Sequence, residues 1–324
     1  MNTLEPVGGT DRRNRVRLIV ERASELTPLR AVAMRAIQLA EDERAAAMDL
    51  ATVVSSDPAL TAKLLRLSNS AYYGYARRIA TVREAVILLG MRTVRSVAIA
   101  SGVIDAFNAQ QRKDGFNRDL FWAHSVVVGL VAEAVARDTK AARPEDAFTA
   151  GVIHDIGKLA MQVAEPAPFA RMVRLIEGGT PYDEAEQEIF GVSHAHVGAR
   201  LAERWHFPES LVEAIRLHDP VTPITRIESL ADVVASANLA CNREGLAGGF
   251  DWVNDPARHP SEPLAAQVGV ALGRVHGGMR TLEEKGRAFL KHVSTQAPRW
   301  YQARADDEGP PEMAGEQPNE GEVA

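Results

Sequence analysis

The chain has 324 residues, of which 46% are hydrophobic and 25% charged, proportions that suit a soluble globular protein of one large or two smaller domains. The formal charge of -6 arises in the last stretch, ADDEGPPEMAGEQPNEGEVA, whose seven acids are matched by no base, so that the rest of the chain carries about +1. A nearly neutral body gives no global argument for a nucleic-acid or membrane-surface partner.

The chain contains a single cysteine, Cys241, so no intramolecular disulfide can form and a reducing compartment is expected. The N-terminal MNTLEPVGGTDRRNR has no apolar segment behind its charges. A membrane span needs about 18 or more consecutive apolar residues, and no uncharged run of that length is visible. We therefore predict a cytoplasmic protein with no membrane partner.

Apolar residues recur at three- and four-residue spacing almost throughout, and strand-like alternation is missing, so the sequence predicts an all-α protein. The expected helices, in chain order, are 13–25, 29–41, 46–55, 58–70, 81–89, 92–107, 118–138, 144–162, 167–177, 181–190, 194–205, 208–217 and 224–241.

Local sequence signals support several of these helix starts. Asp57 followed by Pro58 is typical of an N-cap before a first-turn proline. Thr81 and Glu84 have the spacing of a capping box, and Ser193 is a further N-cap candidate.

The polar stretch NAQQRKDGFNR divides the helices into two groups. The acidic C-terminal sequence has too little apolar surface to offset its ordering entropy, and we predict that it is disordered. The expected organisation is an N-terminal tail at 1–17, a domain at 18–241 with an N-terminal helical subdomain (18–108) and a bundle (118–241), a partly helical extension at 242–304 and a disordered tail at 305–324.

Six of the nine histidines lie between residues 124 and 218. Helical phase places His124 and His194 on apolar faces, so both rings should point inward, whereas His196 should face solvent. His218 follows a helix and precedes Pro220, a position where the helix dipole favours an imidazolium and no metal is needed.

The segment AGVIHDIGKLA places His154, Asp155 and Lys158 inside an apolar run. Imidazole and carboxylate are ligands of transition metals, so His124, His154 and Asp155, with His194 and His218 as further candidates, are a plausible metal site. A bound metal could activate water for phosphoester hydrolysis, and Lys158 could then hold a phosphate. The alternative is that each histidine has its own local partner and that Lys158 forms a structural ion pair.

Several separated segments together resemble the HDOD domain, an HD-related signal-output domain of bacterial regulatory proteins. The resemblance covers roughly residues 22–241. The segments are VVSSDPALTAKLLRLSNSAYYG, IATVREAVILLGMRTVRSVAIA, FWAHS, AFTAGVIHDIGKL and EAEQEIFGVSHAHVGARLAERWHFPESLVEAIRLH. In the last segment, one of the glutamates is part of the resemblance.

The resemblance implies an all-α fold, with an HD-like bundle after an N-terminal helical subdomain, and a role in signalling. Catalytic HD phosphohydrolases use a histidine, the HD pair and a later aspartate, and His124, His154 and Asp155 match the first three. Asn238 stands where the resemblance implies the last acid, so we expect a degenerate site with weakened metal affinity. His218 is followed by DPVTP in place of the GYP loop of related cyclic-di-GMP phosphodiesterases, which argues against that activity.

Three functional hypotheses follow. The leading one is a non-catalytic signalling module that acts through contacts with other signalling proteins, with no cofactor and no nucleic acid; a homo-oligomer is compatible with it. The second is a metal-dependent HD-type phosphohydrolase in which His194 and His218 replace the missing acid around a divalent transition metal. The third is a module that senses a nucleotide in the same crevice without hydrolysing it.

Overall fold

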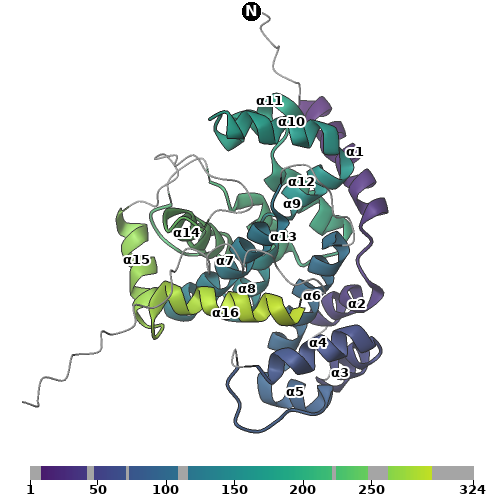
Figure 1. Cartoon of the computed structure of the whole chain (residues 1–324), viewed down its shortest axis with the longest axis vertical. Helices are drawn as coiled ribbons and strands as arrows, with labels where there is room; N and C mark the ends of the chain where they lie inside the picture. The colour runs from purple at the N-terminus through teal and green to yellow at the C-terminus, as the bar shows by residue number, and fades with distance from the viewer. Residues whose placement is uncertain are drawn as a thin grey trace, which may run out of the picture.

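The computed structural model describes residues 9–41, 47–70, 73–108, 116–220, 224–246 and 262–293, and every regular element within these ranges is an α-helix (Figure 1). The all-α prediction is therefore confirmed. The helices are α1 (Gly9–Leu26), α2 (Ala31–Glu41), α3 (Ala47–Ser55), α4 (Pro58–Ser68), α5 (Val82–Leu89), α6 (Met91–Asn108), α7 (Arg118–Thr139), α8 (Pro144–Ile153), α9 (Ile156–Ala164), α10 (Pro166–Glu177), α11 (Tyr182–Phe190), α12 (His194–Arg204), α13 (Glu209–Leu217), α14 (Leu230–Arg243), α15 (Glu262–Gly273) and α16 (Gly278–Val293).

The capping signals act as the sequence predicts. The Asp57 side chain accepts hydrogen bonds from the backbone N–H groups of Ala59 and Leu60 at the start of α4. Thr81 and Glu84 form a complete capping box at α5. Ser193 accepts from the backbone N–H of His196 at the start of α12. These local hydrogen bonds fix where the chain enters each helix.

Two expected helices differ from the structure. The expected helix at 144–162 is interrupted at His154 and Asp155, which separate α8 from α9. The expected helix at 224–241 begins only at Leu230, because Ser229 and Asp232 form a capping box there. The first break is functionally important, since it removes His154 and Asp155 from regular helical geometry.

Helix α7 is the central element of the bundle, and α8, α14, α15 and α16 all pack against it. By length and composition α7 could cross a membrane, but 72% of its most apolar window is buried inside the protein, as in the core helix of a globular domain. Helices α2 to α5 form a lobe at the bottom of Figure 1, and α6 connects it to the bundle by packing on both α2 and α8.

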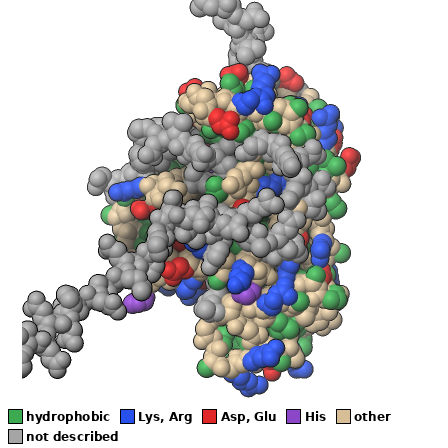
Figure 2. Space-filling model, viewed as in Figure 1, with side chains coloured by type: hydrophobic (Ala, Val, Ile, Leu, Met, Phe, Trp, Pro, Cys, Tyr) green, Lys and Arg blue, Asp and Glu red, His purple; other side chains and the backbone are tan. Residues whose placement is uncertain are grey.

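Buried polar contacts join the lobe to the bundle. Arg118, at the start of α7, donates to the carbonyl of Phe107 in α6 at 2.6 Å and to Oε1 of Gln162 in α9 at 2.8 Å. On the face seen in Figure 2, basic and acidic side chains are interspersed. The predicted disorder of 305–324 concerns residues outside those that the structure describes.

Helices α9 and α12 approach so closely that their backbones touch. A Cβ atom built on Gly157 would lie 1.9 Å from the carbonyl oxygen of His194, and one on Gly151 would lie 2.5 Å from the Cα of Gly129 in α7. Only glycine permits such contacts. The two contacts fix the positions of the HD break and of His194 relative to each other.

We expect Gly157→Ala to lower the free energy of unfolding by about 3 kcal/mol or more, because the added methyl group meets backbone that cannot move aside. Gly269→Ala is the matched control: Gly269 is exposed on α15 with open space around it, so this change should raise stability by about 0.5–1 kcal/mol. Urea unfolding midpoints measure both. Equal, small effects of the two substitutions would contradict the close contact.

Candidate metal centre

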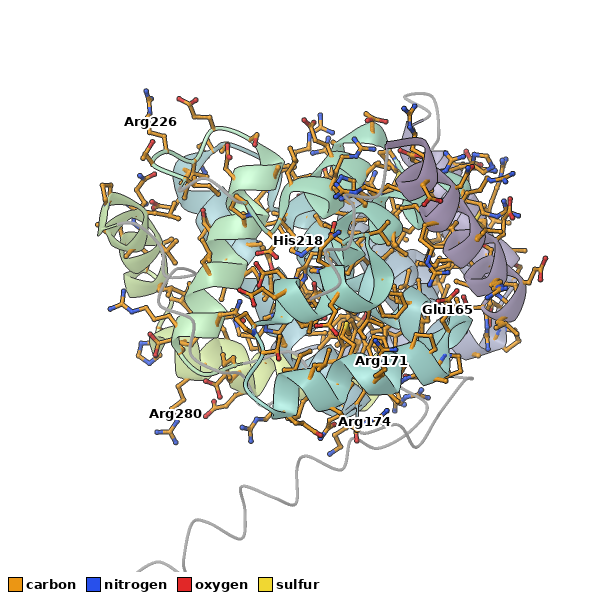
Figure 3. The ribbon with its side chains drawn as sticks, turned by 90° about the horizontal axis from the view of Figure 1, so that it is seen from above. Glu165, Arg171, Arg174, His218, Arg226 and Arg280 are labelled. Carbon is orange, nitrogen blue, oxygen red and sulfur yellow. The ribbon has the colours of Figure 1, made fainter. Side chains whose placement is uncertain are left out.

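Five side chains from four parts of the bundle converge in its interior. His124 comes from the middle of α7, His154 and Asp155 from the break between α8 and α9, His194 from the first residue of α12, and His218 from the C-cap of α13. His124 and His194 are 3% exposed, and the other three are less exposed still. His218 lies near the middle of the ribbon in Figure 3.

Asp155 lies at the centre of this cluster. Its Oδ1 is 3.2 Å from Nε2 of His194 and 3.2 Å from Nε2 of His218. Its Oδ2 is 3.3 Å from Nε2 of His154. The five residues form two groups able to hold a metal ion, His124 with His154 and Asp155, and Asp155 with His194 and His218. Asp155 belongs to both.

Backbone carbonyls fix the ring orientation of three of the histidines. Nδ1 of His154 lies 2.7 Å from the Gly151 carbonyl, Nδ1 of His218 lies 2.7 Å from that of Ile215, and Nδ1 of His124 lies 2.5 Å from that of Leu246. A carbonyl only accepts, so each Nδ1 carries a hydrogen and each Nε2 is directed inward. This is the tautomer that a metal ligand needs.

His194 is oriented by a carboxylate instead. Its Nδ1 lies 3.0 Å from Oε1 of Glu186, which also accepts from the His194 backbone N–H at 2.8 Å and from the Tyr182 hydroxyl at 3.2 Å. Carboxylate–histidine pairs of this kind raise the basicity of a ligating imidazole. The sequence indicated only that a glutamate of EAEQEIF belongs to the motif; the fold identifies it as Glu186.

Burial and neighbouring charges shift the pKa values in this cluster. Burial lowers the pKa of His124 to about 3 and also lowers that of His218, so both rings are neutral at pH 7. Burial opposes ionisation of Asp155 as well, but His154 and Lys158 outweigh it and hold the carboxyl pKa well below its usual range.

His194 behaves in the opposite way. Burial lowers its pKa, but the charge of Glu186 and the close carboxylates of Asp155 and Glu186 more than compensate and raise it to about 9. In the metal-free protein, His194 is therefore an imidazolium between two carboxylates. A metal bound there would take the place of the proton on Nε2.

The donor set fits a transition metal. His154 Nε2 and Asp155 Oδ1 are fully buried and lack a hydrogen-bond partner of acceptable geometry, although both face the centre of the cluster. Unsatisfied buried polar atoms are rare because they cost about 1–3 kcal/mol each, and a bound cation would satisfy both. Imidazole nitrogen with one carboxylate oxygen is the ligand chemistry of zinc, iron, manganese and nickel sites.

The presence of Asn238 in place of an acid does not leave the centre short of metal-binding donors. Its side chain is buried on α14, lines the same small cavity as His124, His194 and His218, and accepts a hydrogen bond from Asn242 at 3.3 Å. The prediction of a degenerate site is wrong, because His194 and His218 supply donors around Asp155 that the motif comparison did not count.

Lys158 lies beside the centre in α9. Its Nζ is 2.6 Å from Oδ2 of Asp155 and 4.9 Å from the centroid of the Tyr182 ring. The cavity at the centre measures about 10 Å³, which is room for roughly one water molecule or ion. The centre is thus a closed site in this conformation.

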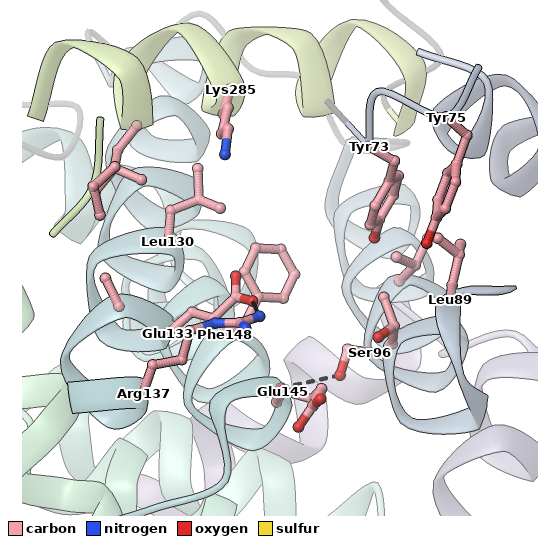
Figure 4. Close-up of a pocket in the computed structure, with 15 residues that line it drawn as sticks. Tyr73, Tyr75, Leu89, Ser96, Leu130, Glu133, Arg137, Glu145, Phe148 and Lys285 are labelled. Atoms are coloured by element: carbon pink, nitrogen blue, oxygen red, sulfur yellow. Dashed lines mark hydrogen bonds and ion pairs between the residues drawn. The ribbon is translucent and has the colours of Figure 1, made fainter. Parts of the chain in front are cut away.

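A larger cavity of about 440 Å³ lies elsewhere, between the N-terminal lobe and helices α7 and α16 (Figure 4). Tyr73 and Tyr75 form one wall, with stacked rings 6.5 Å apart. Glu133 and Arg137 of α7 lie on the opposite wall, and Lys285 of α16 points into the space. It shares no lining residue with the metal centre.

Comparison with known protein families matches residues 26–221, more than half of the chain, to the HDOD domain. The chain belongs to the HDOD domain family. The resemblance seen in the sequence is confirmed. Helices α7 to α13 of the bundle fall within the matched residues, whereas α14 to α16 follow them.

One curated protein and one solved HDOD domain structure are similar to this chain. An uncharacterized protein of Treponema pallidum is 30% identical over 195 residues, which cover 59% of this chain but only 37% of that protein. The crystal structure of an HDOD domain protein with unknown function from Geobacter sulfurreducens is similar, with 26% identity, a TM-score of 0.70, and coverage of 88% of this chain and 99% of that one.

Two further crystal structures share the fold. One is a putative phosphohydrolase from Shewanella amazonensis, with 26% identity, a TM-score of 0.65, and coverage of 86% of this chain and 98% of that one. The other is a putative signal transduction protein from Marinobacter aquaeolei, with 21% identity, a TM-score of 0.68, and coverage of 90% of this chain and 66% of that one. At 21% identity, the likeness to the Marinobacter aquaeolei structure shows a shared fold and nothing more.

We expect the protein to bind zinc or manganese, and His154→Ala to weaken that binding by at least about 100-fold, because it removes a donor already directed at the centre. His196→Ala is the matched control, since His196 is exposed on the same helix as His194 and its Nδ1 lies 2.6 Å from the Ser193 hydroxyl. Competition with a chromogenic chelator measures both affinities. Equal affinities for the two variants would place the metal elsewhere.

Metal affinity should rise with pH up to about 9, by about tenfold per unit, because the metal displaces one proton from His194. Calorimetry at pH 7 in buffers of different ionisation enthalpy should show the release of that proton. Glu186→Gln removes the charge that raises the His194 pKa, so it should flatten the pH dependence. An unchanged slope in Glu186→Gln would assign the proton to another group.

Proposed function

We propose that this chain is a signal-transduction module of the HDOD type that holds a divalent transition metal in its buried centre and acts through contacts with other signalling proteins, without turning over a substrate. Asp155 would hold the ion together with His124 and His154 or with His194 and His218. Such an ion supplies Lewis-acid chemistry when bound. In this proposal its role is structural: it satisfies the buried donors and fixes the helices that carry them.

The closure of the centre is the observation that carries the proposal. A cavity of about 10 Å³ accepts an ion but no phosphoester, and ligand sites for organic molecules typically measure about 300 Å³ or more. The Lys158 ammonium, the group best suited to hold a phosphate, is paired with Asp155 in the protein interior and is 4% exposed. The same small volume argues against the crevice as a nucleotide-sensing site.

A metal-dependent phosphohydrolase is the second candidate, and the complete donor set favours it. Two groups of donors that share Asp155, with four imidazoles between them, exceed what one structural ion needs. The Shewanella amazonensis structure described as a putative phosphohydrolase, at 26% identity, adds support by analogy. For this activity, the bundle would have to open enough to admit a phosphoester beside Lys158.

A screen of phosphatase and phosphodiesterase substrates with Mn, Fe, Ni and Mg separates the two candidates. We expect no turnover above background, together with a rise in Tm on metal addition that His154→Ala abolishes and His196→Ala keeps. Turnover that His154→Ala removes and His196→Ala retains would establish the phosphohydrolase instead.

A further inference from the structure

A groove of about 750 Å³ runs between α1 and α12, on the outside of the bundle and away from the metal centre. Helix α1 packs against α9 and α12 and is held by ion pairs from Arg15 and Arg22 to Glu165 (Figure 3). The groove's floor includes the apolar side chains of Val16 and Val192. It is therefore a defined depression with walls from distant parts of the chain.

Positive charge dominates this groove. Three of its arginines come from the exposed side of α1, and two come from α12 and α13. Glu203 is the one acid among the described residues that line it, and it is shared by two arginines at 2.7 Å each. The charged side chains that line the groove are Arg12, Arg13, Arg17, Arg200, Arg216 and Glu203.

Arg12 and Arg17 of α1 are exposed and can meet an external anion. Glu21 is 3.9 Å from Arg17, a long and exposed contact worth little in water. Guanidinium groups pair with carboxylates in a bidentate manner, and several of them around an apolar floor suit a peptide with many acidic side chains. The groove is therefore complementary in charge to an acidic peptide segment.

The chain carries such a segment in its own sequence. Residues 305–324 contain seven acids and no base, whereas the remaining 304 residues carry about +1 in total. The described structure ends at Val293, and 31 residues follow it. A chain of that length can span on the order of 100 Å when extended, so the groove is within reach.

We propose that the groove between α1 and α12 is a docking site for an acidic peptide segment, and that residues 305–324 of the same chain occupy it. A tethered segment acts at an effective concentration of the order of millimolar, so even a weak contact keeps the groove filled. An acidic segment of a partner protein must then displace the tail. This inference does not depend on the metal centre or on what the centre does.

Binding of a labelled peptide tests the proposal with full-length chains throughout. The probe is a fluorescein-labelled peptide of residues 305–324, followed by anisotropy, and the acceptor is a chain whose seven tail acids are changed to Asn or Gln. We expect this tail-neutralised chain to bind the peptide at least about tenfold more tightly than the wild type, because its groove is open. Binding should weaken steeply with salt.

Groove variants and a matched control assign the site. Arg12→Gln with Arg17→Gln, made in the tail-neutralised chain, should weaken peptide binding at least about tenfold. Arg226→Gln with Arg280→Gln is the control, because both arginines lie on the opposite side of the molecule from α1 in Figure 3. Circular dichroism verifies that each variant is folded.

Three outcomes would overturn the proposal. Equal peptide affinity in wild-type and tail-neutralised chains would show that the tail does not fill the groove. Equal losses in the groove variant and in the control would show that the peptide responds only to overall charge. ATP that binds the wild type as tightly as the tail-neutralised chain, and is weakened by the groove substitutions, would make the groove a nucleotide site that the tail leaves empty.

Discussion

A carboxylate buried in the protein interior, Asp155, is the group around which the HD-like bundle is arranged. A charge of this kind is expensive to remove from water unless cations or hydrogen-bond donors surround it. Lys158 supplies one cation at 2.6 Å, and the imidazoles of His154, His194 and His218 lie within 3.3 Å. Each imidazole comes from a helix end or a helix break, and each has its outer nitrogen fixed by a carbonyl or by Glu186. The helices therefore have to end where they do for the charge to be compensated.

Much of this arrangement can be predicted from sequence, because it depends on local signals. Helical phase placed His124 and His194 inside and His196 outside, and capping residues fixed the starts of α4, α5 and α12. The break at His154 and Asp155 could not be predicted, since the sequence there is apolar and continuous, and the close contact of Gly157 with α12 is set by tertiary packing. Asn238 led to the wrong prediction of a degenerate site, because the motif comparison considered only the position of the last acid. A metal can bind any donor that the fold brings close to it.

The structural and the catalytic interpretation of the metal centre differ in whether a substrate can reach the ion. The donors, their tautomers and the carboxylate behind His194 are what a catalytic ion needs, yet the space around them admits only an ion or a water molecule. An HDOD protein can keep a complete set of ligands for its contribution to stability alone, because deleting one member of a buried, paired network is strongly destabilising. The presence of such ligands is therefore evidence for metal binding and not, by itself, for turnover.

The first turn of α12 separates two environments. His194 faces the interior, while its neighbours Ser193 and His196 line the arginine groove outside. A wall one turn thick is shared by both, so any effect of binding on one side upon affinity on the other would be a thermodynamic linkage. Such a linkage is reciprocal in equilibrium terms: whatever factor an acidic segment applies to ion affinity, the ion applies to that segment.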